Sequence, residues 1–351
     1  MNIFVDILFV IVLLLSLAED YIDVRKKYCI LVGLFLVMII AATVKPVGIV
    51  ADSESYEEMF YNNDDPLIET MTEPTYIYLS RFVLLFGGGV AVMFFVYALI
   101  SVPLKLLLID RMTPCLFTAM AIYVPVYYEL HDLVQIRAAA AGAFIMMALY
   151  NYANKKYFST AVAFVVACLF HYSSVSFLPV LLICKFVRGK SGRIAMACVV
   201  PLGFAFYFAH RDLFSLLPSA LTAGKIDFYK DAAETGVGGW DEMLAPYKNI
   251  FFLFKCTLFY VYLYYYDYLS EKNRYFAPVM LAEAGSFFWL LTMSTIPVLA
   301  SRVSDLYAIF DAVFFTFAIY LIEPKIVVKV TIICIGAYML VYNMLNSGYF
   351  G

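Results

Sequence analysis

The chain has 351 residues, of which 64% are hydrophobic and only 15% are charged, and its mean hydropathy is +0.86. A water-soluble domain is close to half apolar and a quarter charged, so this composition excludes an ordinary soluble protein. At roughly 20 residues per span, the apolar residues suffice for around ten to thirteen crossings and leave no room for a separate soluble catalytic domain. The net charge of -3 says little about function. We therefore expect a single membrane domain over residues 1–351.

The membrane segments are predicted to be helices, which makes the fold class all-α and polytopic. Continuous apolar runs such as residues 30–42 exclude a barrel, whose strands would alternate polar and apolar residues. The first run lacks the basic start and the cleavage site of a signal peptide, so we interpret it as the first span. In chain order the apolar runs are 3–18, 28–45, 75–86, 89–109, 115–130, 134–152, 157–170, 173–187, 193–209, 250–269, 275–297, 303–322 and 326–345.

The run 75–86 is too short to cross a bilayer comfortably. It ends in Gly87-Gly88-Gly89, a flexible break that can turn the chain back, so we expect a re-entrant or interfacial half-helix. About twelve crossings then remain. With that number, most basic residues fall in short loops on one side, which is the cytoplasmic side, and both termini lie outside. The residues on that side are Arg25, Lys26, Lys27, Lys105, Arg111, Lys155, Lys156, those within 185–193, Lys272, Arg274, Lys325 and Lys329.

Two longer segments are predicted on the outer side. Residues 46–74 are acidic and contain no Lys or Arg. Within them, residues 52–61 begin with Asp52 and Ser53 and continue with acidic residues, which is typical of a capped surface helix. Residues 211–249 combine glycines, charges and aromatic residues, and we expect them to form a mobile lid.

Neither a metal nor another cofactor is expected. The seven cysteines fall in apolar runs without CxxC spacing, so they indicate neither a disulfide framework nor a thiolate metal site. The sequence has no HExxH, P-loop, GxSxG or dinucleotide-binding motif. The predicted cytoplasmic side has no DxD motif and no acidic cluster, so a nucleotide-sugar site with a divalent metal is not indicated there.

Ionisable side chains within or beside the spans converge on the outer side. Each costs on the order of 3 kcal/mol inside a span, so each needs a partner or a function. Arg137 lies near the outer end of its span, Arg302 at the outer start of another, and His171 at an outer turn. All three histidines of the chain lie at outer ends. The further candidates near that depth are Glu73, Arg81, Glu129, His131, Asp132 and His210.

Several of these residues also have a structural interpretation. Arg81 could snorkel toward lipid headgroups, and His171 could cap the next helix. Arg302 could form an ordinary ion pair with Asp305, three residues further on. The alternatives stay open for these residues.

Arg137 is harder to explain as a structural residue. The residues 138–142 that follow it are all small, so the helix face below it allows close packing or a bound ligand. Elsewhere, Lys255 and Glu283 lie within two different predicted spans and could pair with each other or snorkel. The sequence does not decide between these two alternatives.

Arginines and histidines that face outward between helices favour an anionic lipid headgroup as ligand. Guanidinium groups bind phosphate or pyrophosphate through paired hydrogen bonds. Hydroxylated rings at the same depth could stack on sugars, although packing or a place in the interface belt is the simpler role for most of them. These rings are Tyr123, Tyr127, Tyr128 and Tyr172.

Four segments carry a family resemblance in their order and spacing. They are DSESY from Asp52, EPTYIYLSR from Glu73, QIRAAAAGAFIMMALYNYANKKYF from Gln135 and CLFHYSSVSFLP from Cys168, with a weaker echo at 302–307. In these segments the chain resembles the EpsG-like branch of the Wzy-type polymerases of O-antigen or exopolysaccharide. That family commonly carries Gln-Gly after the motif arginine, where this chain has Ala138-Ala139. The departure puts a role for the glutamine in doubt, but not the role of the arginine.

The resemblance implies a GT-C-like glycosyltransferase of the bacterial inner membrane. It would join oligosaccharide repeat units carried on undecaprenyl pyrophosphate, facing the periplasm or the outside. The growing chain would pass from one lipid carrier to the next unit, with release of undecaprenyl pyrophosphate and without a metal. Donor, acceptor and membrane lipids are the expected partners, a chain-length regulator stays open, and no nucleic acid is expected.

The resemblance also suggests roles for individual residues. Arg137 and Arg302 would bind and stabilise the donor pyrophosphate. His171 is the leading general base or acceptor-orienting residue, because an ordinary imidazole titrates near neutral pH, with Glu73 or Asp52 as rivals. The remaining expected substrate contacts are Tyr56, Arg81, His131, Tyr172 and Ser173, together with Asp305 as the residue that orients Arg302.

Other functional classes remain as alternatives. A lipid-linked oligosaccharide flippase or transporter would also place arginines between helices, but it should have a midplane cavity and usually repeat symmetry. A membrane O-acyltransferase would need an intramembrane histidine and an acyl donor from the cytoplasm, whereas no histidine is predicted on that side. A purely structural subunit would carry three outward arginine sites without a function for them.

Overall fold

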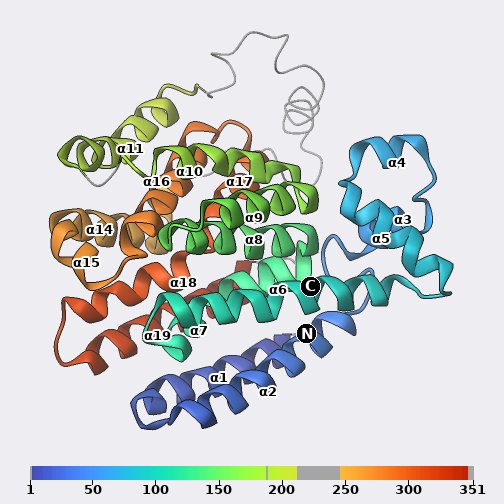
Figure 1. Ribbon diagram of the computed structural model, residues 1–351, viewed down its shortest axis with the longest axis horizontal. Coiled ribbons are helices and arrows are strands. Elements are labelled where there is room, and N and C mark those ends of the chain that lie inside the picture. The colour runs from blue at the N-terminus through green and yellow to red at the C-terminus, as the bar shows by residue number, and fades with distance from the viewer. Residues whose placement is uncertain (1, 187–188, 212–245, 347–351) are drawn as a thin grey trace. The chain divides into compact units, whose positions relative to one another are not determined.

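The computed structural model describes residues 2–186, 189–211 and 246–346, and every regular element in these ranges is a helix (Figure 1). This confirms the all-α prediction. The chain divides into two compact units, Met1–Val175 with Asp311–Gly351, and Ser176–Phe310. We call them unit 1 and unit 2 and describe each by itself. The predicted lid falls mostly on residues 212–245, which lie outside the described residues.

Unit 1 contains the segments that carry most of the predicted site. Its elements are α1 (Asn2–Ala18), η1 (Glu19–Tyr21), α2 (Val24–Thr43), α3 (Ser53–Tyr61), α4 (Pro66–Met71), α5 (Pro74–Leu85), α6 (Val90–Met112), α7 (Leu116–Ile122), the π-helix η2 (Tyr123–Val134), α8 (Ile136–Ala153), α9 (Tyr157–Phe170), α18 (Asp311–Phe314), η7 (Phe315–Tyr320) and α19 (Lys325–Asn346). The short helix η3 (Tyr172–Phe177) leads from unit 1 into unit 2.

Unit 2 is a smaller group of helices. It consists of α10 (Leu178–Ile183), α11 (Lys190–Phe208), η6 (Pro246–Lys248), α14 (Ile250–Tyr264), α15 (Tyr266–Lys272), α16 (Phe276–Thr292) and α17 (Pro297–Ala308). Within this unit α16 packs against both α11 and α17.

Four of the described helices are long and apolar enough to cross a membrane, namely α2, α6, α11 and α19. Large hydrophobic side chains on them are exposed, as expected of helices that face lipid. Together with the composition, these helices identify a membrane protein. The number of about twelve crossings stays a prediction.

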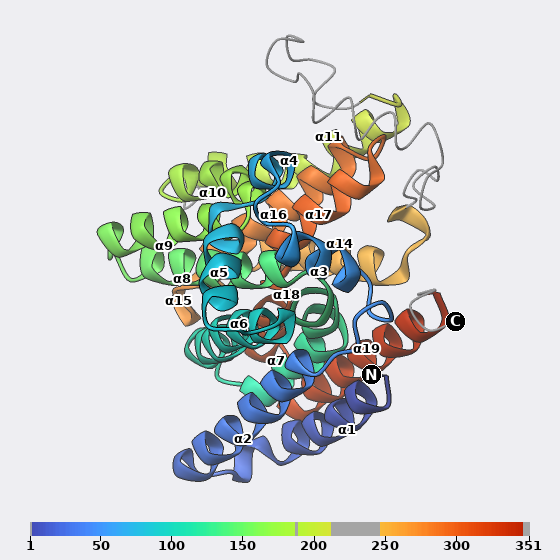
Figure 2. The same cartoon turned by 90° about the vertical axis from the view of Figure 1, so that its right-hand side faces the viewer.

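Small residues let the helices of unit 1 approach closely. Residues 138–141 of α8 are alanines and all are buried, and α8 packs against α6 and α9. At the other end of the unit, α1, α7 and α19 lie side by side (Figure 2). A very close approach there is at Gly336 of α19, where a Cβ atom would overlap the backbone carbonyl oxygen of Ala121 in α7. Only glycine fits this position.

Replacing Gly336 by alanine should therefore destabilise the protein. The obstacle is backbone and cannot rotate away, so α19 and α7 must separate, at a cost of about 1–3 kcal/mol. Gly33→Ala is the matched control, because a Cβ atom at this position of α2 meets nothing within 4 Å. Alanine is the better helix former, so the control should be neutral or stabilising by up to about 1 kcal/mol. Thermal unfolding in detergent compares the two, and equal midpoints would contradict this account of the packing.

The predicted outer segment forms a small arm of three helices, α3, α4 and α5, beside the start of α6 (Figures 1 and 2). The surface helix predicted over 52–61 is observed as α3. The predicted cap by Asp52 is wrong, because its side chain makes no capping hydrogen bond. Asp52 has a φ of 59°, a left-handed backbone, whereas capping residues are usually extended.

The half-helix predicted for the run 75–86 is observed as α5, which begins at Pro74, a residue preorganised for the first helical position. The glycine break also occurs where it was predicted. Gly87 has a φ of 72°, and the N–H of Gly88 bonds to the carbonyl of Val83 at 3.0 Å, which closes the helix end before α6 begins. Whether α5 enters the bilayer stays a prediction.

Two predicted runs have a different internal structure. Run 115–130 continues as the π-helix η2 to Val134, and α8 starts only at Ile136. Gln135 lies between them with φ -96° and ψ 65°, outside the helical region, and forms a sharp junction two residues before Arg137. In unit 2, α17 begins at Pro297, earlier than the predicted 303, because proline starts the helix.

Lys105 is a correction to the predicted orientation. We expected it in a short cytoplasmic loop, but it lies inside α6 and its side chain is 0% exposed. Its ammonium contacts the carboxylate of Asp132, in η2, at 2.9 Å. A lysine can lie within an apolar helix when a distant residue supplies the opposite charge, and no sequence-local signal shows such a partner.

Candidate functional site

Glu73 is the centre of a buried polar cluster in unit 1. It directly precedes α5, and its backbone carbonyl accepts the N–H of Tyr76 at 3.0 Å, as the residue before a helix does. The side chain makes no capping hydrogen bond to α5 and is only 5% exposed. The proline that follows Glu73 therefore starts the helix, while the carboxylate is left to contact other segments.

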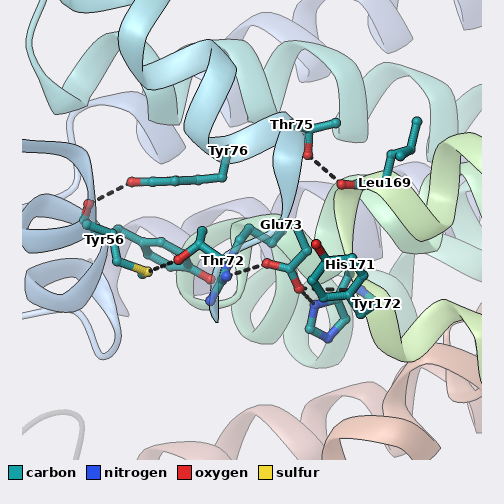
Figure 3. Close-up of polar contacts among 10 residues, drawn as sticks. Tyr56, Thr72, Glu73, Thr75, Tyr76, Leu169, His171 and Tyr172 are labelled. Carbon is teal, nitrogen blue, oxygen red and sulfur yellow. Dashed lines mark hydrogen bonds and ion pairs between the residues drawn. The ribbon is translucent and has the colours of Figure 1, made fainter. Parts of the chain in front are cut away.

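The Glu73 carboxylate joins two predicted site residues. Its Oε2 accepts a hydrogen bond from Nη1 of Arg137, and its Oε1 lies 2.7 Å from Nδ1 of His171. The backbone N–H of Tyr172 also points at Oε1, at 3.4 Å (Figure 3). Arg137 and His171, which lie 64 and 98 positions after Glu73 in the sequence, thus meet on its carboxylate. We call Glu73, Arg137 and His171 the Glu73 cluster.

Arg137 is held over two tyrosine rings. Its guanidinium carbon lies 5.4 Å from the ring centre of Tyr56 and 5.9 Å from that of Tyr76. The hydroxyl of Tyr76 in turn donates to the backbone carbonyl of Tyr56 at 2.6 Å, which ties α5 to α3 (Figure 3). Arg137 Nε is buried and has no partner among the described residues, and the side chain is 21% exposed. The unpaired Nε therefore lies inside the protein, while another part of the side chain reaches the surface.

His171 ends α9 and presents its ring at the same place. Its backbone carbonyl accepts the N–H of Ser174 at 3.0 Å, so the chain turns at this residue. With Nδ1 directed at the carboxylate of Glu73, the other ring nitrogen, Nε2, points away from it (Figure 3). The side chain is 20% exposed. A carboxylate that accepts the Nδ1–H leaves the Nε2 lone pair available as a base.

The electrostatics of the cluster keep Glu73 ionised. Burial alone would raise the pKa of the Glu73 carboxyl, but the hydrogen bond with His171 and the charge of Arg137 outweigh it and lower the pKa to about 2. A carboxylate with so low a pKa is a weak base at neutral pH. This argues for His171 over Glu73 as the general base and gives Glu73 the task of holding its two partners.

Arg81 makes its contacts within the outer arm. It bonds to the carbonyl of Asn63 at 3.0 Å and pairs with Asp64 at 3.4 Å and with Glu69 at 3.1 Å. These contacts connect α5 with the loop and helix before it, so they explain Arg81 as a residue that shapes the arm. Its predicted contact with substrate stays a prediction.

His131 lies fully buried in η2, beside the ring of Tyr127 at 5.8 Å. Neither of its ring nitrogens has a partner among the described residues. Next to it, Asp132 accepts hydrogen bonds from Tyr123 at 2.7 Å and from Ser101. This network, which includes Lys105, was not predicted from the sequence.

The remaining predicted substrate contacts of unit 1 lie in segments that also contribute to the Glu73 cluster or contact it. Asp52 precedes α3, which carries Tyr56, and Ser173 follows Tyr172. Tyr172 is exposed, and its backbone is part of the cluster through the contact with Glu73. Substrate contacts of these residues stay predictions.

Arg302 and Asp305 both lie in α17, in unit 2, three residues apart. Their pairing and the proximity of Arg302 to Arg137 stay predictions. In the same unit, Lys255 and Glu283 form an ion pair at 2.7 Å, which decides an alternative that the sequence left open.

The sequence model of the EpsG family matches residues 26–350 of the chain. No curated protein and no solved structure matches the chain.

Proposed function

We propose that this chain, which belongs to the EpsG family, is a polysaccharide polymerase whose donor and acceptor meet at the Glu73 cluster. Membership of the family favours a polysaccharide polymerase as the general class. The single observation that supports a site here is the convergence of Arg137 and His171 on the carboxylate of Glu73. A partly buried cation and a base held on one carboxylate are suited to a displacement at a sugar pyrophosphate.

Arg137 is the proposed binding group for the donor pyrophosphate. Its side chain is partly exposed, and Glu73 and the two tyrosine rings hold it in place. Pyrophosphate gains charge as the glycosidic bond to it breaks, and a fixed guanidinium stabilises that charge without having to reorganise. Arg302 is proposed as a second arginine for the same group.

His171 is the proposed general base. The acceptor hydroxyl oxygen forms a bond to the anomeric carbon of the donor, and its proton passes to Nε2 of His171. The bond from the anomeric carbon to the pyrophosphate oxygen breaks, and the lipid pyrophosphate leaves with the electron pair. Glu73 stabilises the imidazolium that forms, as a carboxylate on the opposite ring nitrogen does in other enzymes. No metal or covalent intermediate is needed in this scheme.

The finer part of the proposal names the lipid carrier and the face of the membrane at which the reaction occurs. We propose that the lipid is undecaprenyl pyrophosphate and that the repeat units are joined at the outer face of the bacterial inner membrane. About twelve crossings, a GT-C-like arrangement and an outward Glu73 cluster belong to this proposal. It is supported by the acidic outer segment without Lys or Arg, which leads into Glu73.

A reconstituted reaction tests the proposal. The purified protein in lipid nanodiscs is given lipid-linked repeat units, and the products are separated on a gel, with and without EDTA. Chain growth in both conditions, with release of lipid pyrophosphate, is the expected result. Transbilayer movement of the lipid without chain growth would instead indicate a flippase, and transfer of an acyl group would indicate an acyltransferase.

A further inference from the structure

Two contacts fasten the outer arm and the chain before it to the same helix junction. Glu73, directly before the last helix of the arm, pairs with Arg137, the second residue of α8. Before the arm begins, Nζ of Lys45 donates to the backbone carbonyl of Leu133 at 2.6 Å, just before η2 ends. Both attachments fall within residues 133–137, on either side of the break at Gln135. Lys45 therefore lies in the chain before the arm and in space at the origin of α8.

Lys45 is buried in a way that is unusual for a lysine outside a span. α2 ends at Thr43, yet the Lys45 residue is only 4% exposed. Its ammonium lies 4.1 Å from the ring centre of Phe94 in α6. Burial of a charge is costly, so the position is maintained only where its contacts compensate for lost hydration. The carbonyl of Leu133 and the ring of Phe94 are two such contacts.

The hydrogen bond from Lys45 to the carbonyl of Leu133 can fix where α8 begins. The last carbonyls of a helix have no partner in the following turn and need one from elsewhere. Here the chain leaves η2 and starts α8 through one non-helical residue, and Arg137 follows four residues after Leu133. A shift of this carbonyl therefore moves the origin of α8 and the guanidinium with it.

We propose that Lys45 is a positioning residue for glycosyl transfer, which fixes the junction between η2 and α8 and thereby the place of Arg137. This inference rests on the proposed function of the Glu73 cluster. Lys45 is not expected to contact the substrate. It acts by holding the backbone carbonyl of Leu133, four residues before Arg137.

The charge of Lys45 makes its contact with the Leu133 carbonyl sensitive to pH. Burial lowers the pKa of Lys45 to about 7, while Asp132 and Asp52, the acidic groups that act on it, only partly oppose this. The ammonium that interacts with Leu133 and Phe94 is therefore progressively lost as pH rises through about 7. In the unfolded chain the lysine keeps its proton to higher pH, so the folded protein does not lose stability from this titration. Positioning and stability should thus respond differently to pH.

The test compares Lys45→Met and Lys45→Arg with the wild type in the reconstituted reaction. Lys45→Met should lower the turnover of chain growth by roughly tenfold to a hundredfold, because small misplacements of a binding group have effects of this size. Its KM for the donor and its thermal midpoint should change little. Lys45→Arg should restore turnover, because arginine also donates to the carbonyl. Arginine keeps its charge above about pH 7, so this variant should not lose activity there as the wild type does. Lys26→Met, at a lysine whose side chain is 76% exposed, is the control and should match the wild type.

A second measurement does not depend on activity. Hydrogen exchange of the backbone amides around residues 135–139 should be faster in Lys45→Met than in the wild type and in Lys26→Met. Unchanged exchange, or undiminished turnover in Lys45→Met, would overturn the role of Lys45. If the wild type itself forms no polymer, the proposed function fails, and faster exchange in Lys45→Met would still assign Lys45 to the junction.

Discussion

Replacing Glu73 by glutamine is expected to stop polymer formation almost completely. The change removes the negative charge between Arg137 and His171 and leaves a partly exposed guanidinium without its counter-charge. Removing one partner of a fully buried ion pair costs about 3–5 kcal/mol, and here the guanidinium can lower this cost by moving toward water, away from its two tyrosines. A displacement of this kind costs about 10²-fold or more in turnover. The reconstituted reaction measures the rate, and thermal unfolding measures the stability.

Glu69→Gln is the matched control for this change. Glu69 belongs to the same outer arm and pairs with an arginine, Arg81, but its side chain is 49% exposed. Ion pairs at the surface contribute about 0–1 kcal/mol, so this variant should polymerise at close to the wild-type rate. Equal loss of activity in both variants would mean that the arm as a whole matters and that the Glu73 cluster does not.

Replacing His171 by asparagine should reduce turnover by about 10²–10⁴-fold, the range expected when a general base is removed. The amide nitrogen of asparagine can take the place of Nδ1, 2.7 Å from the carboxylate of Glu73, whereas Nε2 has no counterpart. The variant therefore keeps the contact that organises the cluster and loses only the base. Steady-state kinetics with lipid-linked donor and acceptor should show a fall in kcat with little change in KM.

His171→Asn also separates two roles of this residue. If turnover falls as expected, His171→Ala should be as inactive and also less stable, because it additionally loses the contact with Glu73. A variant His171→Asn with wild-type turnover would show that the ring only organises the cluster. The base would then have to be another residue of unit 1, with Asp52 as the remaining predicted rival.

The helices were largely predictable because each apolar run has to satisfy its own backbone hydrogen bonds, and charges or prolines bound it. The half-helix α5 and its glycine break followed from local sequence in the same way. The cap by Asp52 failed because its left-handed backbone depends on the turn before it, which no residue type alone specifies. A break was predicted at 130–134, between two apolar runs, and the observed junction lies slightly later, at Gln135, because the polar residues there limit the apolar runs without marking the turn of the backbone.

The contacts of the candidate site were predictable in part. Arg137, His171 and Glu73 stand out because each is ionisable and lies beside an apolar run, and their predicted common depth is matched by direct contact. Tyr76 in α5 lies under Arg137, but the sequence does not distinguish it from the 28 other tyrosines of the chain. Lys45 and Lys105 were missed because lysines near span ends usually snorkel to water, and only the fold shows what holds these two inside.

The most direct test of the central claim is a gel of surface polysaccharide from cells that carry a deletion, the wild type or Arg137→Ala, with the protein level measured in the same membranes. We expect Arg137→Ala to lose the ladder of long chains at a normal protein level, while single repeat units still reach the surface. Long chains in this variant would contradict the role of Arg137 in the donor site. Loss of surface units altogether would contradict a polymerase and indicate a flippase.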